Sequence, residues 1–167
     1  VSLVGSEMCI RDRIYAASLL NACINRGDII TNTGIYHLIN VMGNYRIEKK
    51  KIWKTPTTLV LELYTKFHKG KILKSVVNSS NFVSFKLGKQ PEYKNNKLID
   101  SAVTMNGKYM CMSVVNKSSS EKILLKVPHL DRIAENYCIE GSNKVDLNTY
   151  ANTSKAVSYT HLRAHET

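Results

Sequence analysis

The sequence predicts a mainly β fold, an antiparallel β-sandwich preceded by a single helix–strand–helix unit of the parallel α/β type. Three observations lead to this fold class. Residues 14–68 alternate helical and β-rich periodicity. After Gly70 only short β-rich segments separated by turns follow, a pattern typical of sandwiches. Asn106-Gly107 between two of these segments is the strongest two-residue hairpin signal in the chain. We therefore expect a domain boundary near Gly70.

The first predicted element is a helix over Ile14–Asn25. Its apolar side chains recur at helical spacing, and they are Leu19, Leu20, Cys23 and Ile24. Gly27 stands where a helix C-cap favours positive φ, so we expect the helix to end there. Ile29–His37 follows as a short β-rich segment and is predicted to be a strand.

The second helix is predicted over Thr55–His68. Thr55 is suited to the N-cap and Pro56 to the first helical position, while residues 43–54 carry the turn and charge signals of a loop. His68 closes the helix, where its charged form would interact favourably with the helix dipole. The helix–strand–loop–helix order is that of a parallel α/β unit.

The remainder reads as strands. Six segments have the length and residue types of strands, namely Ile72–Val77, Phe82–Phe85, Leu98–Met105, Tyr109–Val115, Ile123–Val127 and Arg132–Glu140. Met105, Met110 and Met112 alternate with polar neighbours across two of them, which predicts a core stripe rather than a metal site.

The two ends are expected to be translated sequencing-adapter sequence. Back-translated with allowed codons, Leu3–Arg13 gives a DNA whose reverse complement encodes Val157–Glu166, residue for residue. Such segments carry no information about a fold. We therefore expect residues 1–13 and 156–167 to be artefacts, and the natural insert to be an internal piece of a longer reading frame.

The net charge of +11 raises the question of nucleic-acid binding. Most lysines are dispersed and no aromatic stacking motif is interleaved with them, so we expect no nucleic-acid partner. The one tight cluster, Lys49-Lys50-Lys51, lies beside Glu48 and is interpreted as a solvated surface. No apolar stretch is long enough to span a bilayer, so no membrane partner is expected.

The insert holds three cysteines with no C-x-x-C pair and no His at ligand spacing, which argues against a zinc site. Cys23, Cys111 and Cys138 each lie in an apolar segment, a pattern that favours buried free thiols in a reducing, cytoplasmic compartment. A secretion signal could precede the insert.

Three segments of the insert resemble the C-terminal part of the family 51 glycoside hydrolases, the α-L-arabinofuranosidases. They are YAASLLNACINRGDII from Tyr15, YHLINVM from Tyr36, and EGSNKVDLNTYANTSK from Glu140, which is similar to the family's G-x-x-x-x-x-x-N-T-aromatic ending. TPTTLVLELYTKFHKGKIL from Thr55 looks like the last barrel helix leading into the sandwich, and SVVNKS from Ser113 looks like a family strand and turn. Their order and spacing make the resemblance specific.

The resemblance implies a (β/α)8 (TIM) barrel followed by a C-terminal β-sandwich. Residues 14–70 would be helix seven, strand eight and helix eight of the barrel, and residues 71–155 the sandwich. It further implies a retaining, exo-acting parent enzyme that releases terminal arabinofuranosyl residues from hemicellulosic arabinosides without a cofactor. The family's catalytic glutamates lie on barrel strands four and seven, upstream of Ile14, so no catalytic residue is expected in this fragment. A homo-oligomer of the full-length parent is a further expectation.

What the fragment can contribute is one wall of the sugar pocket, because barrel enzymes bind substrate at the C-terminal ends of their strands. His37 stands where the family places a polar side chain, often Gln, that touches arabinose; it could instead cap the strand end. Asn40 could contact the sugar or bond the loop backbone. Tyr45 and Trp53 flank the loop and could stack on a sugar, although packing is favoured for Trp53.

Two other functions are weighed. A non-catalytic carbohydrate-binding β-sandwich module predicts a row of exposed aromatics on one sheet face. The candidates, Phe82, Phe85, Tyr93, Tyr109 and Tyr137, show no such row in the sequence. A basic nucleic-acid-binding protein predicts salt-dependent retardation of DNA or RNA. Apolar faces on both helices also predict a tendency to aggregate.

Overall fold

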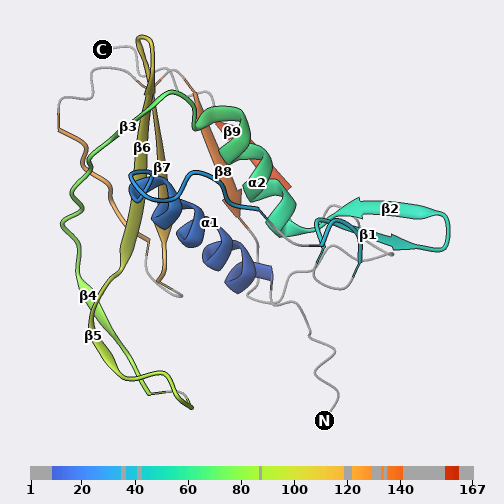
Figure 1. Ribbon diagram of the computed structural model, residues 1–167, viewed down its shortest axis with the longest axis horizontal. Coiled ribbons are helices and arrows are strands. Elements are labelled where there is room, and N and C mark those ends of the chain that lie inside the picture. The colour runs from blue at the N-terminus through green and yellow to red at the C-terminus, as the bar shows by residue number, and fades with distance from the viewer. Residues whose placement is uncertain are drawn as a thin grey trace. The chain divides into compact units, whose positions relative to one another are not determined.

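The computed structural model describes residues 9–34, 37–40, 43–86, 88–118, 122–128, 133, 135–140 and 157–161. Two helices and nine strands lie in this described part of the chain (Figure 1), so the prediction of a mainly β fold is confirmed. Their bounds are α1 Cys9–Asn25, β1 Tyr45–Glu48, β2 Lys51–Lys54, α2 Pro56–Phe67, β3 Lys71–Leu73, β4 Asn81–Ser84, β5 Tyr93–Lys97, β6 Ile99–Asn106, β7 Tyr109–Asn116, β8 Asn136–Glu140 and β9 Val157–His161.

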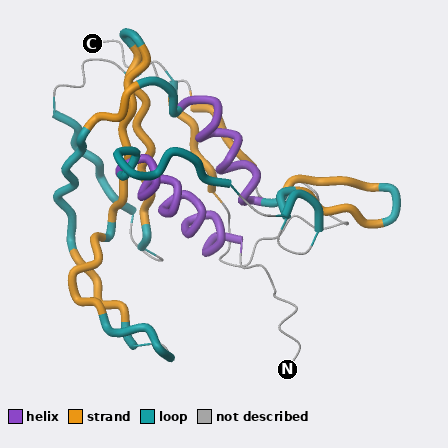
Figure 2. The backbone as a smooth tube through the Cα atoms, in the orientation of Figure 1, coloured by secondary structure: helices purple, strands orange, loops and turns teal. Residues whose placement is uncertain are grey.

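The chain divides into two compact units. Unit 1 comprises residues 1–16, 33–64 and 124–167, and unit 2 comprises residues 17–32 and 65–123. Each unit therefore contains residues from both sides of Gly70, and irregular segments such as 74–80 join the elements (Figure 2). The assignment of 14–70 to a barrel and 71–155 to a sandwich stays a prediction.

The centre of unit 2 is an antiparallel three-stranded sheet in the order β3–β6–β7. β6 and β7 pair along their whole length, from Ile99 opposite Asn116 to Asn106 opposite Tyr109. The connecting turn is therefore Gly107-Lys108, one residue later than the sequence suggested, with Gly107 at φ 59°. Residues 101–104 of the central strand β6 are all buried, so both faces of the strand are covered there.

The end of α1 is attached to this sheet by polar contacts. The Ser113 hydroxyl donates to Asn21 Oδ1 at 2.5 Å, and Asn25 Nδ2 donates to the Ser101 carbonyl at 2.8 Å. Asn21 is completely buried, and Ser113 stands directly opposite the buried Ala102. Small residues on this face leave room for a helix to approach, and the amides satisfy polar groups that burial would otherwise leave without water.

Unit 2 also contains a hairpin that the sequence did not predict in full. β4 was expected, but its partner β5 was not, since Lys and Asn are poor strand formers. Pairing with β4 supplies the hydrogen bonds that the composition does not favour, from Asn81 opposite Lys97 to Ser84 opposite Tyr93, with a register irregularity between them. Tertiary pairing therefore overrides local propensity here.

Unit 1 corrects the prediction of a loop over residues 43–54. Most of this segment is an antiparallel hairpin, with Tyr45 opposite Lys54 and Glu48 opposite Lys51. Its turn residue Lys49 has φ 54°, a conformation that side-chain-bearing residues rarely adopt. The lysine-rich composition concealed the strand pattern of Tyr45, Ile47, Ile52 and Trp53. Unit 1 also holds β8 and β9, paired from Asn136 opposite His161; β9 lies in the expected adapter segment, whose origin stays a prediction.

The strand expected over Ile29–His37 is not formed in its described residues. Residues 30–34 and 37 have no regular secondary structure, and Ile39 makes only an isolated bridge to Tyr45. A parallel strand gains its hydrogen bonds only from neighbouring strands, and no described strand pairs with this segment. The strand predicted over Ile123–Val127 is also wrong, and its residues 124–126 are exposed.

α2 agrees closely with its prediction and begins at Pro56 directly after Thr55, as the capping pattern indicated. α1 ends at Asn25 as predicted but begins at Cys9, before the predicted start at Ile14 and inside the expected adapter segment. No helix among the described residues combines the length and the apolar character needed to cross a membrane.

Candidate functional site

The candidate site is the segment from His37 to the first turns of α2, within unit 1. Asn40 organises its beginning and has φ 53°, a conformation that Asn tolerates better than most residues. Its backbone N–H donates to the Tyr45 carbonyl at 2.8 Å, and its Oδ1 accepts from the Ile47 N–H at 2.8 Å. Gly43 N–H donates to the Asn40 carbonyl at 2.6 Å. Asn40 therefore bonds the loop backbone, one of the two roles expected for it.

The hairpin register places Tyr45 and Trp53 on opposite faces. Directly paired residues share a face, so Tyr45 lies with Lys54 and Trp53 with Arg46. Trp53 is only 9% exposed, which agrees with the packing role favoured for it, whereas Tyr45 is half-buried. The two aromatics cannot line a single surface of the hairpin.

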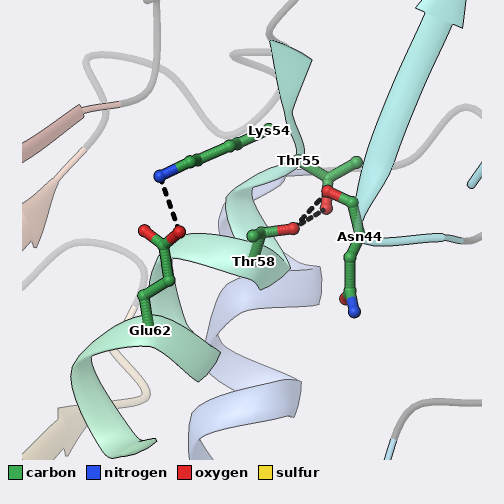
Figure 3. Close-up of polar contacts among 5 residues, drawn as sticks. All are labelled: Asn44, Lys54, Thr55, Thr58 and Glu62. Carbon is green, nitrogen blue, oxygen red and sulfur yellow. Dashed lines mark hydrogen bonds and ion pairs between the residues drawn. The ribbon is translucent and has the colours of Figure 1, made fainter. Parts of the chain in front are cut away.

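The base of the hairpin is joined to α2 by a group of polar contacts that the sequence analysis did not single out (Figure 3). The Thr58 hydroxyl donates to the Asn44 carbonyl and lies 3.1 Å from the Thr55 hydroxyl. Thr55 and Thr58 are both buried. Lys54 Nζ lies 2.6 Å from Glu62 Oε1, and this hydrogen bond raises the pKa of Lys54.

The Lys54–Glu62 pair contributes little to stability. Both side chains are nearly half exposed, so water screens their attraction and the pair is worth less than about 1 kcal/mol. The buried threonines carry more of the attachment, because the Thr58 hydroxyl and the Thr55 backbone N–H both donate to the Asn44 carbonyl at the helix start. The sequence signal that pointed to these threonine contacts was the Thr55-Pro56 capping pattern at the start of α2.

His37 is exposed and precedes the Asn40 turn. Of the four residues predicted for the sugar pocket, the structure joins Asn40 and Tyr45 through their backbones. It places Trp53 on the other face of the hairpin from Tyr45. Contact of any of the four with a sugar stays a prediction.

Titratable groups of unit 2 form a separate cluster on the buried face of β6 and β7. His68 Nδ1 lies 3.2 Å from the Thr104 hydroxyl, and Thr104 stands directly opposite Cys111. Burial lowers the pKa of His68 and raises the pKa of the Cys111 thiol. Both groups are therefore neutral near pH 7, and the thiol is a poor nucleophile. The expected stabilisation of a charged His68 by the helix dipole is outweighed by desolvation.

Several of the described acidic side chains have structural partners. Asp28 lies 3.2 Å from Arg26 and Glu92 lies 3.5 Å from Lys94. Glu135 accepts a hydrogen bond from the Tyr137 hydroxyl at 2.9 Å. Within the described part of the chain no group of three or more His, Cys, Asp or Glu side chains could hold a metal ion, and Cys23, Cys111 and Cys138 are free thiols.

The aromatics weighed for a carbohydrate-binding module do not form a row. On the β4–β5 hairpin, Phe82 lies opposite Asn96 and Tyr93 lies opposite Ser84, with a register irregularity between the two pairs. Phe85 follows Ser84 in the chain beyond the strand end. The irregularity interrupts the regular alternation of faces, so the register gives no extended row of aromatics of the kind that such a module predicts.

Comparison with known proteins now bears on the whole chain. The sequence model of the α-L-arabinofuranosidase C-terminal domain matches residues 3–166. The chain belongs to this family. The resemblance to this family seen in the sequence is therefore confirmed.

Solved structures of α-L-arabinofuranosidases share this domain's fold. The thermostable family 51 enzyme from Thermotoga petrophila is 22% identical with a TM-score of 0.74, and covers 89% of this chain and 33% of its own. The enzyme from Thermotoga maritima, solved as an arabinose complex, is 22% identical with a TM-score of 0.71 and the same coverage. The family 51 enzyme AbfB from Bifidobacterium longum is 15% identical with a TM-score of 0.71, and covers 87% and 29%.

The chain thus spans about a third of the length of the solved enzymes that it matches. A comparison with curated proteins gives no significant match.

Proposed function

We propose that the parent protein is a retaining, exo-acting α-L-arabinofuranosidase that releases terminal arabinofuranosyl residues from hemicellulosic arabinosides. This chain would supply its accessory β-sandwich and one wall of its sugar pocket. The observation that carries the proposal is the match of the family model over residues 3–166. The similar fold of three α-L-arabinofuranosidases supports it.

The bond-breaking groups would lie on the part of the parent outside this chain. Retaining glycosidases need two carboxyl groups about 5–5.5 Å apart, one as acid/base and one as nucleophile. Two of the acids described here pair with neighbouring cations, Glu62 with Lys54 and Asp28 with Arg26.

The first test compares the full-length parent with this chain on 4-nitrophenyl α-L-arabinofuranoside. We expect the parent to release nitrophenol and the pure chain to release none, because the chain would lack both catalytic carboxyl groups. The anomer released first, read by proton NMR, should retain the substrate's configuration. Turnover by the pure chain, or inversion by the parent, would contradict the proposal.

His37 is the residue that we expect to contact the sugar from this chain. It is exposed and lies at the position that the resemblance assigns to the end of barrel strand eight. His37→Ala in the full-length parent should lower kcat/KM by about tenfold, the cost of one hydrogen bond at a binding site. The melting temperature should stay unchanged, since an exposed side chain contributes little to the core.

Asn96 on β5 gives the control, because its side chain bonds locally to the Tyr93 carbonyl. Asn96→Ala should leave kcat/KM unchanged. Equal kinetics for His37→Ala and the wild type would remove His37 from the pocket, and Asn40, Tyr45 and Trp53 would then remain as wall residues to be tested.

A further inference from the structure

We propose that Met105 and Met110, at the turn end of the β6–β7 hairpin (Figure 1), form a reversible modification site at which a peroxide oxidises both thioethers to sulfoxides. The sequence predicted that these methionines belong to a core stripe, but their side chains are 40% and 45% exposed. The site lies in unit 2, and its chemistry does not depend on the activity of the parent.

The register places both thioethers on one face of the sheet. Met105 of β6 stands directly opposite Met110 of β7, and directly paired residues share a face. The Cβ atoms of such a pair lie about 4.5–5.5 Å apart. The two side chains therefore form a single patch beside the Gly107-Lys108 turn.

The helix α1 covers the other face of this sheet. Ser113 of β7 bonds Asn21 of α1, so the helix lies on the face that carries Ser113. Side chains alternate along a strand, so Met110 and Met112 lie on the face opposite to Ser113. The face that α1 covers is therefore not the one that carries the Met105–Met110 pair.

Burial along β6 confines the exposure to the turn end. Residues 101–104 are buried, and Met105 is the first residue toward the turn that is exposed. Met112 is half-buried and stands opposite Val103, which is only 8% exposed. Met112 thus offers the same side chain on the same face, but next to covered residues. The chain therefore contains its own control for the effect of exposure.

The oxidation needs only a thioether and a peroxide such as hydrogen peroxide. A sulfur lone pair attacks one peroxide oxygen, so the S–O bond forms as the O–O bond breaks. The proton on the transferred oxygen passes to the departing hydroxide, which leaves as water; the sulfur is oxidised and the peroxide is reduced. The product is polar where the thioether was apolar, and methionine sulfoxide reductases return it to the thioether.

The neighbouring thiol is a weak competitor for the peroxide. Thiols react as thiolates, and burial raises the pKa of Cys111, which keeps it protonated near neutral pH. A thioether has no proton to lose, so the reactivity of Met110 does not depend on such an ionisation. Accessibility of the sulfur is therefore what distinguishes one methionine of the hairpin from another.

The test exposes the 167-residue chain to dilute hydrogen peroxide at neutral pH and follows the uptake of oxygen with time by peptide mass spectrometry. Cleavage after lysine separates the two strands, because Leu98–Lys108 contains Met105 and Tyr109–Lys117 contains Met110 and Met112. Fragment ions of the second peptide assign the oxygen to one methionine or to the thiol between them. The same reaction in urea gives the rate of each methionine in the unfolded chain.

In the folded chain we expect Met105 and Met110 to be oxidised at least about threefold faster than Met112, because the exposed sulfurs meet the peroxide more often. In urea the three rates should become equal, since the fold no longer shields any of them. Methionine sulfoxide reductases A and B, added with a thiol reductant under native conditions, should restore the original mass of both peptides.

Two variants locate the fast reaction. Met105→Leu with Met110→Leu replaces both thioethers by apolar side chains of similar size and should remove the fast oxidation from the hairpin without changing the rate at Met112. Met112→Leu is the matched control, and it should leave the fast oxidation of the pair unchanged.

Three results would overturn the proposal. Equal rates at the three methionines of the folded chain would mean that the fold does not select the pair. Faster oxidation of Met112 than of Met105 or Met110 would contradict the exposure that the structure assigns to them. Sulfoxides that the reductases remove only in urea would show that the modification is not reversible in the folded protein.

Discussion

At the scale of single residues, His68 shows how a buried environment decides a charge state. Its position after the last residue of α2 would favour the imidazolium through the helix dipole. In the structure the ring is half-buried against Thr104, and loss of hydration lowers its pKa. The neutral ring is therefore the folded form near neutral pH.

This lowered pKa predicts a loss of stability in mild acid. In the unfolded chain His68 takes up a proton near its ordinary pKa of about 6.5. The folded state resists protonation until a lower pH, so the unfolded state binds more protons in that window and the free energy of unfolding falls as the pH drops below about 6.5. Above that pH both states are neutral at this residue and it adds no pH dependence.

The measurement is urea denaturation of the chain between pH 5 and pH 8, taken as an order-of-magnitude window around the ordinary pKa. His68→Gln keeps a hydrogen-bonding group near Thr104 but does not titrate, so its unfolding free energy should depend less on pH. Identical pH dependence in the wild type and His68→Gln would show that His68 is as easily protonated in the fold as outside it.

Residue roles could be predicted where local geometry decides them. Asn40 bonds the backbone of its own loop, and Trp53 is a packing residue. Each of these roles was one of the two that the sequence analysis gave for the residue. The prediction of a core stripe of methionines was wrong for Met105 and Met110, which are 40% and 45% exposed. Alternation defines two faces of a strand, but which face is covered depends on what packs there.

At the scale of elements, two amides attach the end of α1 to the unit 2 sheet. Asn21 is completely buried and bonds Ser113, while Asn25 reaches the Ser101 carbonyl. Buried hydrogen bonds of this kind are directional, so they orient the helix on the sheet more narrowly than apolar contact would.

We therefore expect Ser113→Ala to lower the free energy of unfolding by about 1–3 kcal/mol, because it removes the hydroxyl that donates to the buried Asn21 Oδ1. Asn21→Ala should cost less, because the Ser113 hydroxyl can still donate to the Ala102 carbonyl. The double variant should cost less than the sum of the two, since the shared hydrogen bond is lost only once. Asn96→Ala on β5, where the side chain bonds locally to the Tyr93 carbonyl, should cost less than about 0.5 kcal/mol. Strict additivity in the denaturation curves would mean that the two side chains do not interact.

The elements themselves were predictable where periodicity and capping agree. Both helices and the β6–β7 pair were found from sequence, because their apolar spacing, the Thr55-Pro56 cap and the turn signal of Gly107 act locally, although the turn itself is Gly107-Lys108. β5 and the β1–β2 hairpin were missed, since their Lys and Asn content is unfavourable in isolation and only pairing stabilises them.

At the scale of the whole molecule, many large apolar side chains are open to solvent. Leu124 is 96% exposed, Val76 88% and Phe85 80%, and α1 contributes Tyr15 at 68% and Leu19 at 47%. Single exposed apolar residues are ordinary in soluble proteins, but this number in one chain favours association.

The chain alone is therefore expected to self-associate as its concentration rises, and to bind the dye ANS at neutral pH. Sedimentation velocity over a concentration series checks the first expectation, and fluorescence checks the second. The full-length parent, about three times as long as this chain if it matches its solved relatives, should bind less dye per mole. A monomer at every concentration, with no dye binding, would contradict the expectation.

The sequence by itself determined the class of fold, the family, the two helices and the longest hairpin, because each depends on residue types at fixed local spacing. Tertiary structure alone decided that Ile29–His37 forms no strand among its described residues, that the lysine-rich segment pairs as β1 and β2, and that His68 is neutral. Strand pairing and burial bring together residues far apart in the chain, and their hydrogen bonds and desolvation outweigh what each residue prefers locally.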